Sequence, residues 1–304
     1  MSNGGTENMV EPANSGFART LLYVPGDQRD RLDKAFGRGA DELIVDLEDA
    51  VAKQSKATAR GVVADWMQHH AARANRIWLR INADTPAEDI ETISAPLAGV
   101  MVPRAEIKLL ARVDELLTAR EVPLGIEPGT IALIPLIETA RGLLAAVELA
   151  NMPRVAKLAI GRADIAGELG LSIDPEGPEF RSILLTLVIA SSAAGIMPPL
   201  APTSTDFRDL EALRISTENL MRLGFRGRTA VHPAQLAVIN EVFTPTPEEV
   251  QRAMRLVVAF EDAEHNGSGV VVGDDGRMVD AAVVRSARGV LARARASEKH
   301  HPGE

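Results

Sequence analysis

The chain has 304 residues, of which 46% are apolar and only 3% aromatic, so we expect a large core built from aliphatic side chains. The formal net charge of −9 argues against a sequence-independent nucleic-acid binder, because phosphate binding needs a basic surface. The sequence contains no cysteine, which excludes disulfides, thiolate metal ligands and cysteine nucleophiles and fits a cytoplasmic location.

The two ends of the chain carry no regular apolar pattern. Residues 1–18 are polar and rich in Gly and Asn, and they lack the basic start and apolar run of a signal peptide. We therefore expect a flexible N-terminal tail, and a loose C-terminus over residues 299–304. No run approaches about 18 consecutive apolar residues, so no membrane span and no membrane partner are expected.

Eight short apolar runs alternate with longer amphipathic stretches. The runs predict strands, and because they are apolar on both faces they fit a parallel sheet covered by helices. The predicted strands cover residues 20–26, 42–48, 77–82, 99–104, 131–138, 156–162, 195–202 and 228–233. The predicted helices between them cover residues 28–37, 55–70, 86–95, 105–119, 139–150, 177–194 and 207–222.

Eight such units favour an α/β fold of the closed (β/α)8 TIM-barrel type over residues 19–245. An open doubly wound sheet usually has about six strands. A dinucleotide site is also disfavoured, because no Gly-x-Gly-x-x-Gly motif follows the first strand.

The chain continues well past the eighth strand. Helices are predicted over residues 234–243, 247–265 and 281–297, with a hairpin around Asp275 and Gly276. This pattern indicates a C-terminal extension over residues 246–298, which is too small for an independent domain. We expect it to pack on the barrel or on a neighbouring subunit.

Polar and charged residues gather where the predicted strands end. In a TIM barrel these ends meet at one rim, and the active site lies there. The residues in question are Asp27, Asp46, Glu48, Asp49, Arg80, Asn82, Arg104, Glu138, Arg162, Asp164 and His232. A single acid at a strand end is often a helix cap, and an arginine such as Arg80 is about as often structural as functional. The collection points to chemistry more strongly than any one member.

Four of these acids are expected to converge beside Arg80, namely Glu48, Asp49, Glu138 and Asp164. Neighbouring carboxylates repel one another unless a cation lies among them. With no cysteine and six histidines in the chain, an all-oxygen site suits Mg²⁺, or else Mn²⁺. A lone histidine at the rim indicates a structural or ligand-contacting role rather than a metal ligand.

Short motifs spread in order over residues 19–297 resemble the citrate lyase β-subunit-like proteins of the HpcH/HpaI aldolase superfamily. These motifs are LLYVPGDQRDRLDKAFGRGADELIVDLEDAV (21–51), LRIN (79–82), VPRAE (102–106), LIPLIETARGL (133–143), IGRADIAGELG (160–170), LGFRGRTAVHPAQLAVINEVFTPTPEEV (223–250) and DDGRMVD (274–280). The resemblance implies a (β/α)8 barrel that assembles as trimers or hexamers.

The same resemblance implies Mg²⁺-dependent cleavage or formation of a carbon–carbon bond. The substrate would be a 3-hydroxyacyl thioester of the malyl-, citramalyl- or citryl-CoA type, which gives acetyl-CoA and a 2-oxo acid. The implied metal carboxylates are Glu138 and Asp164, and the implied substrate-binding and charge-stabilising arginine is Arg80.

Other residues take supporting roles under this resemblance. Glu48 and Asp49 of the DLED motif are expected to act through metal-bound waters and by orienting Arg80. Asp280 corresponds to a tail aspartate that in some members enters a neighbour's active site, where it would donate or accept a proton. The usual proline after that aspartate is absent here, which weakens the match for Asp280.

Further cations are expected to contact the substrate. Arg104 stands where the family usually has lysine, which keeps the charge but changes its shape. Arg226 and Arg228 are candidates for the phosphates of coenzyme A, with a solvated loop pair as the alternative, and His232 is a further candidate contact. Arg162 places a cation where small or acidic residues are common in the family.

Two alternative functions stay open. A class II aldolase acting on free 2-oxo acids would share the metal pair and Arg80, but such enzymes usually lack the AVHP and GRMVD segments seen here. The chain also fits the β-subunit of a multi-subunit citrate lyase complex that uses an acyl carrier protein, or a binding subunit that has lost activity.

Overall fold

The computed structural model describes residues 17–171, 177–273 and 276–300. Most of the expected N-terminal tail, residues 301–304 of the expected loose C-terminus and Asp275 of the hairpin lie outside these ranges. The predicted boundaries of the N-terminal tail and of the loose C-terminus are both wrong. Ala18 is buried in the barrel, and residues 299 and 300 belong to the last helix.

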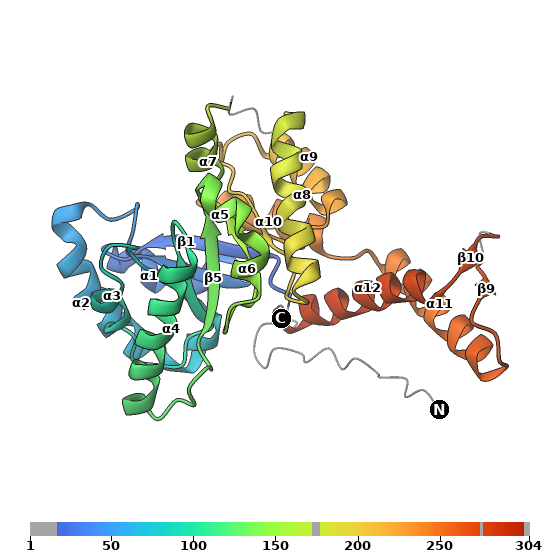
Figure 1. Ribbon diagram of the computed structural model, residues 1–304, viewed down its shortest axis with the longest axis horizontal. Coiled ribbons are helices and arrows are strands. Elements are labelled where there is room, and N and C mark those ends of the chain that lie inside the picture. Colours follow the sequence, from blue (N-terminus) through green and yellow to red (C-terminus); the bar gives the residue numbers. More distant parts are fainter. Residues whose placement is uncertain (1–16, 172–176, 274–275, 301–304) are drawn as a thin grey trace.

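Eight parallel strands close into a barrel in sequence order, which confirms the predicted TIM-barrel fold (Figure 1). The barrel closes where β1 pairs with β8, with Thr20 opposite Arg228. The strands are β1 (Thr20–Pro25), β2 (Glu42–Asp46), β3 (Ile77–Arg80), β4 (Gly99–Val102), β5 (Ala132–Ile137), β6 (Ala159–Ile160), β7 (Leu200–Ala201) and β8 (Gly227–Ala230).

Strand alternation decides which side chains enter the barrel. Along β2, Leu43 and Val45 pack outward in the large cluster beneath the helices, whereas Ile44 belongs to a second cluster inside the barrel. Because side chains alternate between the two faces, Asp46 at the C-terminal end of β2 lies on the interior face with Ile44. An acid is therefore placed inside the barrel by parity alone.

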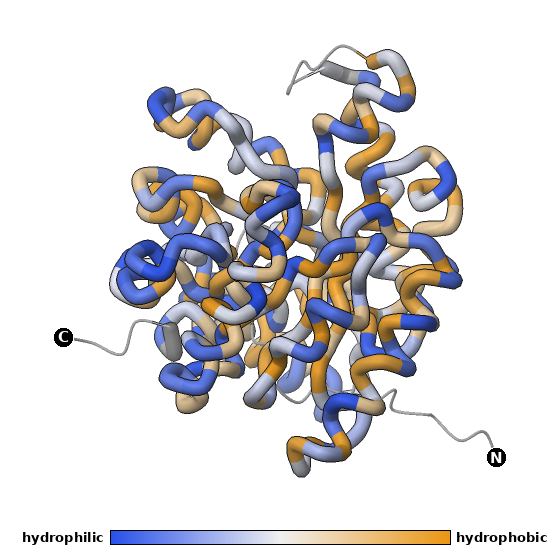
Figure 2. Tube along the Cα trace, turned by 90° about the vertical axis from the view of Figure 1, so that its left-hand side faces the viewer, coloured by the Kyte–Doolittle hydropathy of each residue, from blue (hydrophilic) through white to orange (hydrophobic). Residues whose placement is uncertain are grey.

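The helices surround this barrel, and in Figure 2 they carry hydrophobic and hydrophilic residues in alternation, as helices with one buried face do. The helices that follow the strands are α1 (Arg29–Ala35), α2 (Lys56–His69), α3 (Pro86–Ile90), α4 (Ile107–Glu121), α5 (Ala140–Leu144), α6 (Ala146–Ala150), α7 (Arg162–Leu169), α8 (Pro178–Ala193), α9 (Leu210–Leu223) and α10 (Leu236–Phe243).

Helix α7 was not predicted from the sequence patterns. It is short, it begins directly after Gly161, and it ends at Gly170, whose φ of 66° stops the helix. Within the described ranges, no helix combines the length and apolar character that a membrane crossing requires.

The C-terminal extension consists of a helical hairpin with a small β-hairpin at its tip. It contains α11 (Pro247–His265), β9 (Val271–Val272), β10 (Met278–Val279) and α12 (Ala281–His300). The two strands pair antiparallel, as predicted. A small separate cluster of Phe260, Val279 and Val284 holds the tip together. Figure 1 shows the tip pointing away from the barrel, while the end of α12 returns toward it.

A buried ion pair lies inside the barrel near the N-terminal ends of the strands. Glu42 and Lys157 are 3% and 2% exposed, and Lys157 Nζ lies 3.5 Å from Glu42 Oε2. The indole Nε1 of Trp78 donates to the same oxygen at 2.8 Å, and Lys157 Nζ lies 5.2 Å from the centre of the Trp78 ring. The two charges thus neutralise one another in a place that water does not reach.

We predict that Lys157→Met lowers the free energy of unfolding by about 3 kcal/mol or more, because Glu42 is then buried without a counter-charge. Urea denaturation followed by tryptophan fluorescence measures this change. The matched control is Lys108→Met on the exposed face of α4, which should stay within about 0.5 kcal/mol of the wild type. Equal stability of the two variants would contradict the proposed role of the pair.

Candidate active site

Arg80 and Asp46 form the centre of the rim at the C-terminal ends of the strands. The two residues are direct partners in the register between β2 and β3, and both point into the barrel. Arg80 Nε donates to Asp46 Oδ1 at 2.8 Å, and Arg80 Nη2 donates to Asp46 Oδ2 at 2.6 Å. Arg80 is 8% exposed and Asp46 is 1% exposed. A buried, two-pronged contact of this kind fixes the edge of the guanidinium.

Glu48 and Asp49 reach the free end of the same guanidinium. Arg80 Nη1 lies 3.0 Å from Glu48 Oε2, without hydrogen-bond alignment, and it donates to Asp49 Oδ2 at 3.3 Å. Asp46 also accepts hydrogen bonds from the backbone N–H groups of Glu48 (2.8 Å) and Ala50 (3.2 Å). Asp46 therefore shapes the loop that brings the two further acids to Arg80.

The surroundings of Arg80 and Glu48 shift the pKa values of both residues. Burial works against the charge of Arg80, but the hydrogen bonds and charge of Asp46 outweigh it, so the pKa of the guanidinium is raised. Burial raises the pKa of Glu48 to about 8; the charges of Asp49 and Glu138 act in the same direction and Arg80 opposes them.

Glu138 follows β5 and lies at the same rim, near enough for the charges of Arg80 and Asp49 to act on it. It is 7% exposed, and its Oε2 accepts a hydrogen bond from the backbone N–H of Arg104 at 2.8 Å. Burial raises the pKa of Glu138 to about 7, the Arg104 N–H lowers it, and the charge of Asp164 raises it again. Asp164, in the first turn of α7, is exposed and close enough for its charge to be felt.

Tyr23, in the middle of β1, is a rim residue that the sequence patterns did not single out. The Cζ atom of Arg80 lies 5.0 Å from the centre of the Tyr23 ring, and the hydroxyl donates to Met101 Sδ at 3.2 Å. Burial raises the pKa of the phenol, so it stays protonated. Two signals were available, because Tyr23 is the one tyrosine of the chain and lies at an interior position of its strand.

Arg104 and His232 lie at the edge of the rim. Arg104 has a left-handed backbone with φ of 46°, and its exposed side chain lies 3.2 Å from Asp84 Oδ2. The ring of His232 stacks on Phe207 with centroids 4.5 Å apart, and its Nδ1 accepts from the N–H of Ala234 at the start of the next turn. Both side chains are open to a ligand above the rim.

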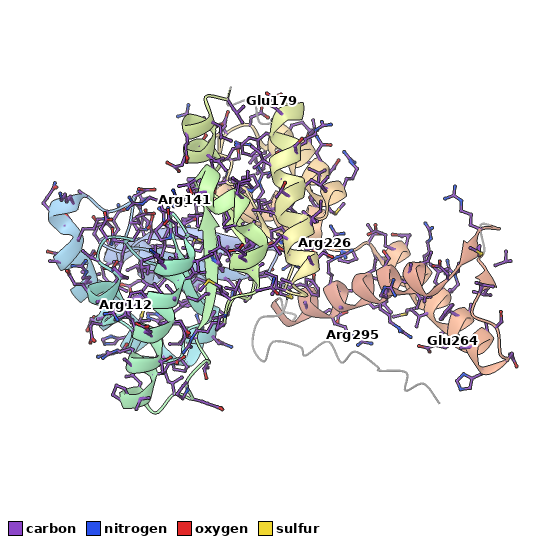
Figure 3. The ribbon with its side chains drawn as sticks, viewed as in Figure 1. Arg112, Arg141, Glu179, Arg226, Glu264 and Arg295 are labelled. Atoms are coloured by element: carbon purple, nitrogen blue, oxygen red, sulfur yellow. The ribbon has the colours of Figure 1, made fainter. Side chains whose placement is uncertain are left out.

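The prediction that Arg228 contacts coenzyme A is wrong. Arg228 is 1% exposed, and its guanidinium donates to Pro202 O, Ser216 Oγ and Thr217 Oγ1 outside the barrel. Arg226 lies just before β8, at the N-terminal end of the barrel near α12 (Figure 3), and donates to the carbonyl of Met221 in α9 and to that of Phe225. Neither arginine belongs to the rim.

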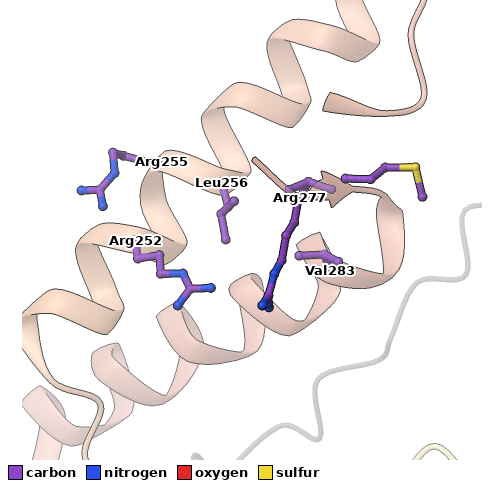
Figure 4. Close-up of a pocket in the computed structure, with 7 residues that line it drawn as sticks. Arg252, Arg255, Leu256, Arg277 and Val283 are labelled. Carbon is purple, nitrogen blue, oxygen red and sulfur yellow. The ribbon is translucent and has the colours of Figure 1, made fainter. Parts of the chain in front are cut away.

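Asp280 is not part of the rim of its own chain. It precedes α12 in the extension, and its Oδ1 accepts hydrogen bonds from the N–H groups of Ala282 and Val283 at 3.0 Å each. A cavity of about 470 Å³ also lies in the extension, away from the rim (Figure 4). Its lining residues are Arg252, Arg255, Leu256, Arg277, Met278, Val279 and Val283.

The chain is similar to known proteins in both sequence and fold. The profile of the HpcH/HpaI aldolase/citrate lyase family matches residues 19–233. A (3S)-malyl-CoA thioesterase of Cereibacter sphaeroides is 35% identical over 278 residues, which are 91% of this chain and 95% of the relative. The citrate lyase β subunit of Escherichia coli K12 is 31% identical over 92% of this chain and 94% of the relative.

A solved structure extends the likeness to three dimensions. The crystal structure of the CitE protein of Mycobacterium tuberculosis, in complex with magnesium, acetoacetate and coenzyme A, superposes with a TM-score of 0.71 at 28% identity. The match covers 93% of this chain and 99% of that one. With a family profile over most of the chain and relatives above 30% identity over nine-tenths of it, this protein belongs to the HpcH/HpaI aldolase/citrate lyase family.

Proposed function

We propose that this protein is a Mg²⁺-dependent carbon–carbon lyase that cleaves or forms a 3-hydroxyacyl-CoA thioester, with acetyl-CoA and a 2-oxo acid as the other reaction partners. The observation that carries the proposal is that the fixed guanidinium of Arg80 lies among carboxylates at the rim. The family contains citrate lyase β subunits, and the related structure holds magnesium and coenzyme A.

Glu138 and Asp164 are the residues that we propose hold the metal. Glu138 Oε2 is occupied by the Arg104 N–H, whereas Oε1 faces Gly161 and has no such donor among the described contacts. No group of three or more metal-binding side chains occurs in the described residues, and Mg²⁺ usually takes one or two carboxylates with waters and substrate oxygens. When bound there, Mg²⁺ would polarise the substrate oxygens and lower the pKa of its hydroxyl.

Arg80 is the proposed stabiliser of the charge that develops on the thioester oxygen when the carbon–carbon bond breaks. Its edge toward Asp46 is fixed, while Nη1 faces Glu48 and Asp49 near the open rim. A fixed donor needs no reorganisation during the reaction, and one such donor is worth roughly 3–4 kcal/mol. Glu48, Asp49 and Asp46 orient this cation, and Arg104 and His232 are proposed contacts for the acyl-CoA substrate at the edge of the rim.

The assembly that we propose is a homotrimer or hexamer located in the cytoplasm. The extension carries Asp280 away from its own rim, so a role in proton transfer would require the rim of a neighbouring copy. The absence of cysteine from the whole chain suits a reducing compartment.

Hydrolysis of the thioester is the second candidate function. It is favoured by one observation, because relatives at 34–35% identity bear the name (3S)-malyl-CoA thioesterase. In hydrolysis the thioester bond breaks and free coenzyme A appears, whereas in the lyase reaction the carbon–carbon bond breaks and the thioester survives. The two functions are therefore separated by their products.

The purified protein should release a 2-oxo acid and acetyl-CoA from at least one of malyl-, citramalyl- and citryl-CoA when Mg²⁺ is present. Free thiol without 2-oxo acid would replace the lyase by the thioesterase. Aldol activity on free 2-oxo acids alone would favour a class II aldolase, and activity only with an acyl carrier protein and partner subunits would favour a citrate lyase complex.

In that assay, Glu138→Gln and Asp164→Asn should each lower turnover by about 100-fold or more, since loss of a group that only supports a metal ligand already costs about 10- to 100-fold. Glu115→Gln on the exposed face of α4 is the control and should leave turnover unchanged. Full turnover of either rim variant in EDTA would contradict the metal assignment.

Gly161→Ala tests whether metal binding requires the Glu138 carboxylate to lie against Gly161. A Cβ atom at this position would lie 2.5 Å from Glu138 Cγ and 2.7 Å from Oε1, so the carboxylate must move. We expect Mg²⁺ affinity, measured by calorimetry, to fall by about 10- to 100-fold. Gly167→Ala in the same helix meets nothing within 4 Å and should bind Mg²⁺ normally. Equal affinities would show that Glu138 is not seated against Gly161.

Mg²⁺ affinity should depend on pH because the pKa of Glu138 is raised to about 7. Below that pH the carboxyl is protonated and the metal must displace the proton, so affinity should fall by up to about tenfold per pH unit and level off above pH 7. Calorimetric titrations from about pH 5.5 to 8.5 measure this slope. A flat profile would mean that Glu138 is not a ligand.

A further inference from the structure

We propose that Tyr23 is a positioning residue that holds the plane of the Arg80 guanidinium in the orientation the reaction needs. The proposal rests on the proposed function, in which Arg80 stabilises the charge on the thioester oxygen. In this proposal the face of the aromatic ring, and not the hydroxyl, positions the guanidinium.

The first step of the argument is that Asp46 fixes only one edge of the guanidinium. Its two hydrogen bonds, at 2.8 and 2.6 Å, lie along that edge. Nη1 on the far side meets Glu48 and Asp49, which follow β2 in a loop and are more exposed than Asp46. Attraction to these two acids would tilt an unsupported guanidinium toward the opening of the barrel.

The second step is that the Arg80 guanidinium lies over the face of the Tyr23 ring. The Cζ atom of Arg80 lies 5.0 Å from the ring centre, within the range of a cation–π contact. The contact is largely shielded from water, because Arg80 is 8% exposed and Tyr23, which is half-buried, packs against the cluster inside the barrel. A flat cation over a flat ring is held in its plane as well as in its place.

The third step is that the ring itself is immobile. Tyr23 stands on β1 and packs in the interior cluster with Ile44, Trp78 and Met101 from three other strands. Its hydroxyl donates to Met101 Sδ at 3.2 Å, and a thioether sulfur is only a weak acceptor. Packing therefore fixes the ring, and the hydroxyl adds little, so phenylalanine should serve in its place.

Three variants test this inference in the full-length protein. Tyr23→Phe keeps the ring face, and we expect kcat within about twofold of the wild type. Tyr23→Leu removes the face, and we expect kcat to fall by about tenfold with a smaller change in KM, the size expected for loss of a shielded cation–π contact. A wild-type kcat for Tyr23→Leu, or an equally impaired Tyr23→Phe, would overturn the proposal.

Arg80→Lys provides the background that separates positioning from general stability. An ammonium group has no plane to orient, so Tyr23→Leu should cost much less kcat in Arg80→Lys than in the wild type. If Tyr23 served only to keep the barrel folded, the loss would be the same in both backgrounds, and that result would overturn the inference.

A second measurement does not depend on activity. The chain contains a single tyrosine, so ¹³Cζ-labelled tyrosine gives one NMR resonance that belongs to Tyr23. We expect this resonance to move in Arg80→Lys and to stay in place in Arg112→Lys, whose side chain is exposed on α4. An unmoved resonance in Arg80→Lys would overturn the contact, whereas absence of any turnover by the wild type would instead overturn the proposed function.

Discussion

The ion pair between Arg80 and Asp46 is the constraint on which the rim depends. A buried guanidinium is tolerated only when its charge and its donors are matched, and the register between β2 and β3 places the matching carboxylate directly opposite. Asp46 then accepts two backbone N–H groups of the following loop. Through these hydrogen bonds, Asp46 positions the loop that carries Glu48 and Asp49. A change in the pairing of these two strands by one residue would remove all three acids from the barrel mouth at once.

The barrel interior contains ion pairs at both of its ends, with opposite consequences. At the N-terminal end Glu42 and Lys157 are matched one to one and sealed by Trp78. At the rim, Arg80 faces Asp46, Glu48 and Asp49, and Glu138 is near enough to interact with the charges of Arg80 and Asp49. Burial is the main reason why the pKa values of Glu48 and Glu138 are raised, and the neighbouring acids add to it. This excess of acid creates the negative potential that suits a divalent cation.

Much of this arrangement was predictable from the sequence by two rules. Eight short runs that are apolar on both faces indicate a parallel barrel, and the C-terminal end of each run indicates the rim. Those rules gave the correct place for Arg80, Glu138 and the DLED acids. The same rules should have excluded Arg226 and Arg228, because Arg226 precedes β8 and Arg228 lies near the start of β8, at the end of the barrel opposite the rim.

The remaining features depend on information that a single chain's pattern does not hold. Tyr23 is the single tyrosine and lies at an interior position of its strand, but its contact with Arg80 joins β1 and β3, which do not follow one another in the chain, and no sequence pattern shows such a contact. The short helix α7 lacks a recognisable period over its 8 residues. The role proposed for Asp280 would require a second copy of the chain, because within its own chain Asp280 accepts N–H groups at the start of α12.

The left-handed backbone at Arg104 has a consequence for how this position can drift during evolution. What Glu138 receives from residue 104 is a peptide N–H, which every residue except proline supplies equally. An exchange of the side chain at this position therefore leaves the hydrogen bond to Glu138 in place. The φ of 46° disfavours branched side chains and tolerates glycine or asparagine, so the backbone conformation limits substitution at residue 104 more than the side chain does.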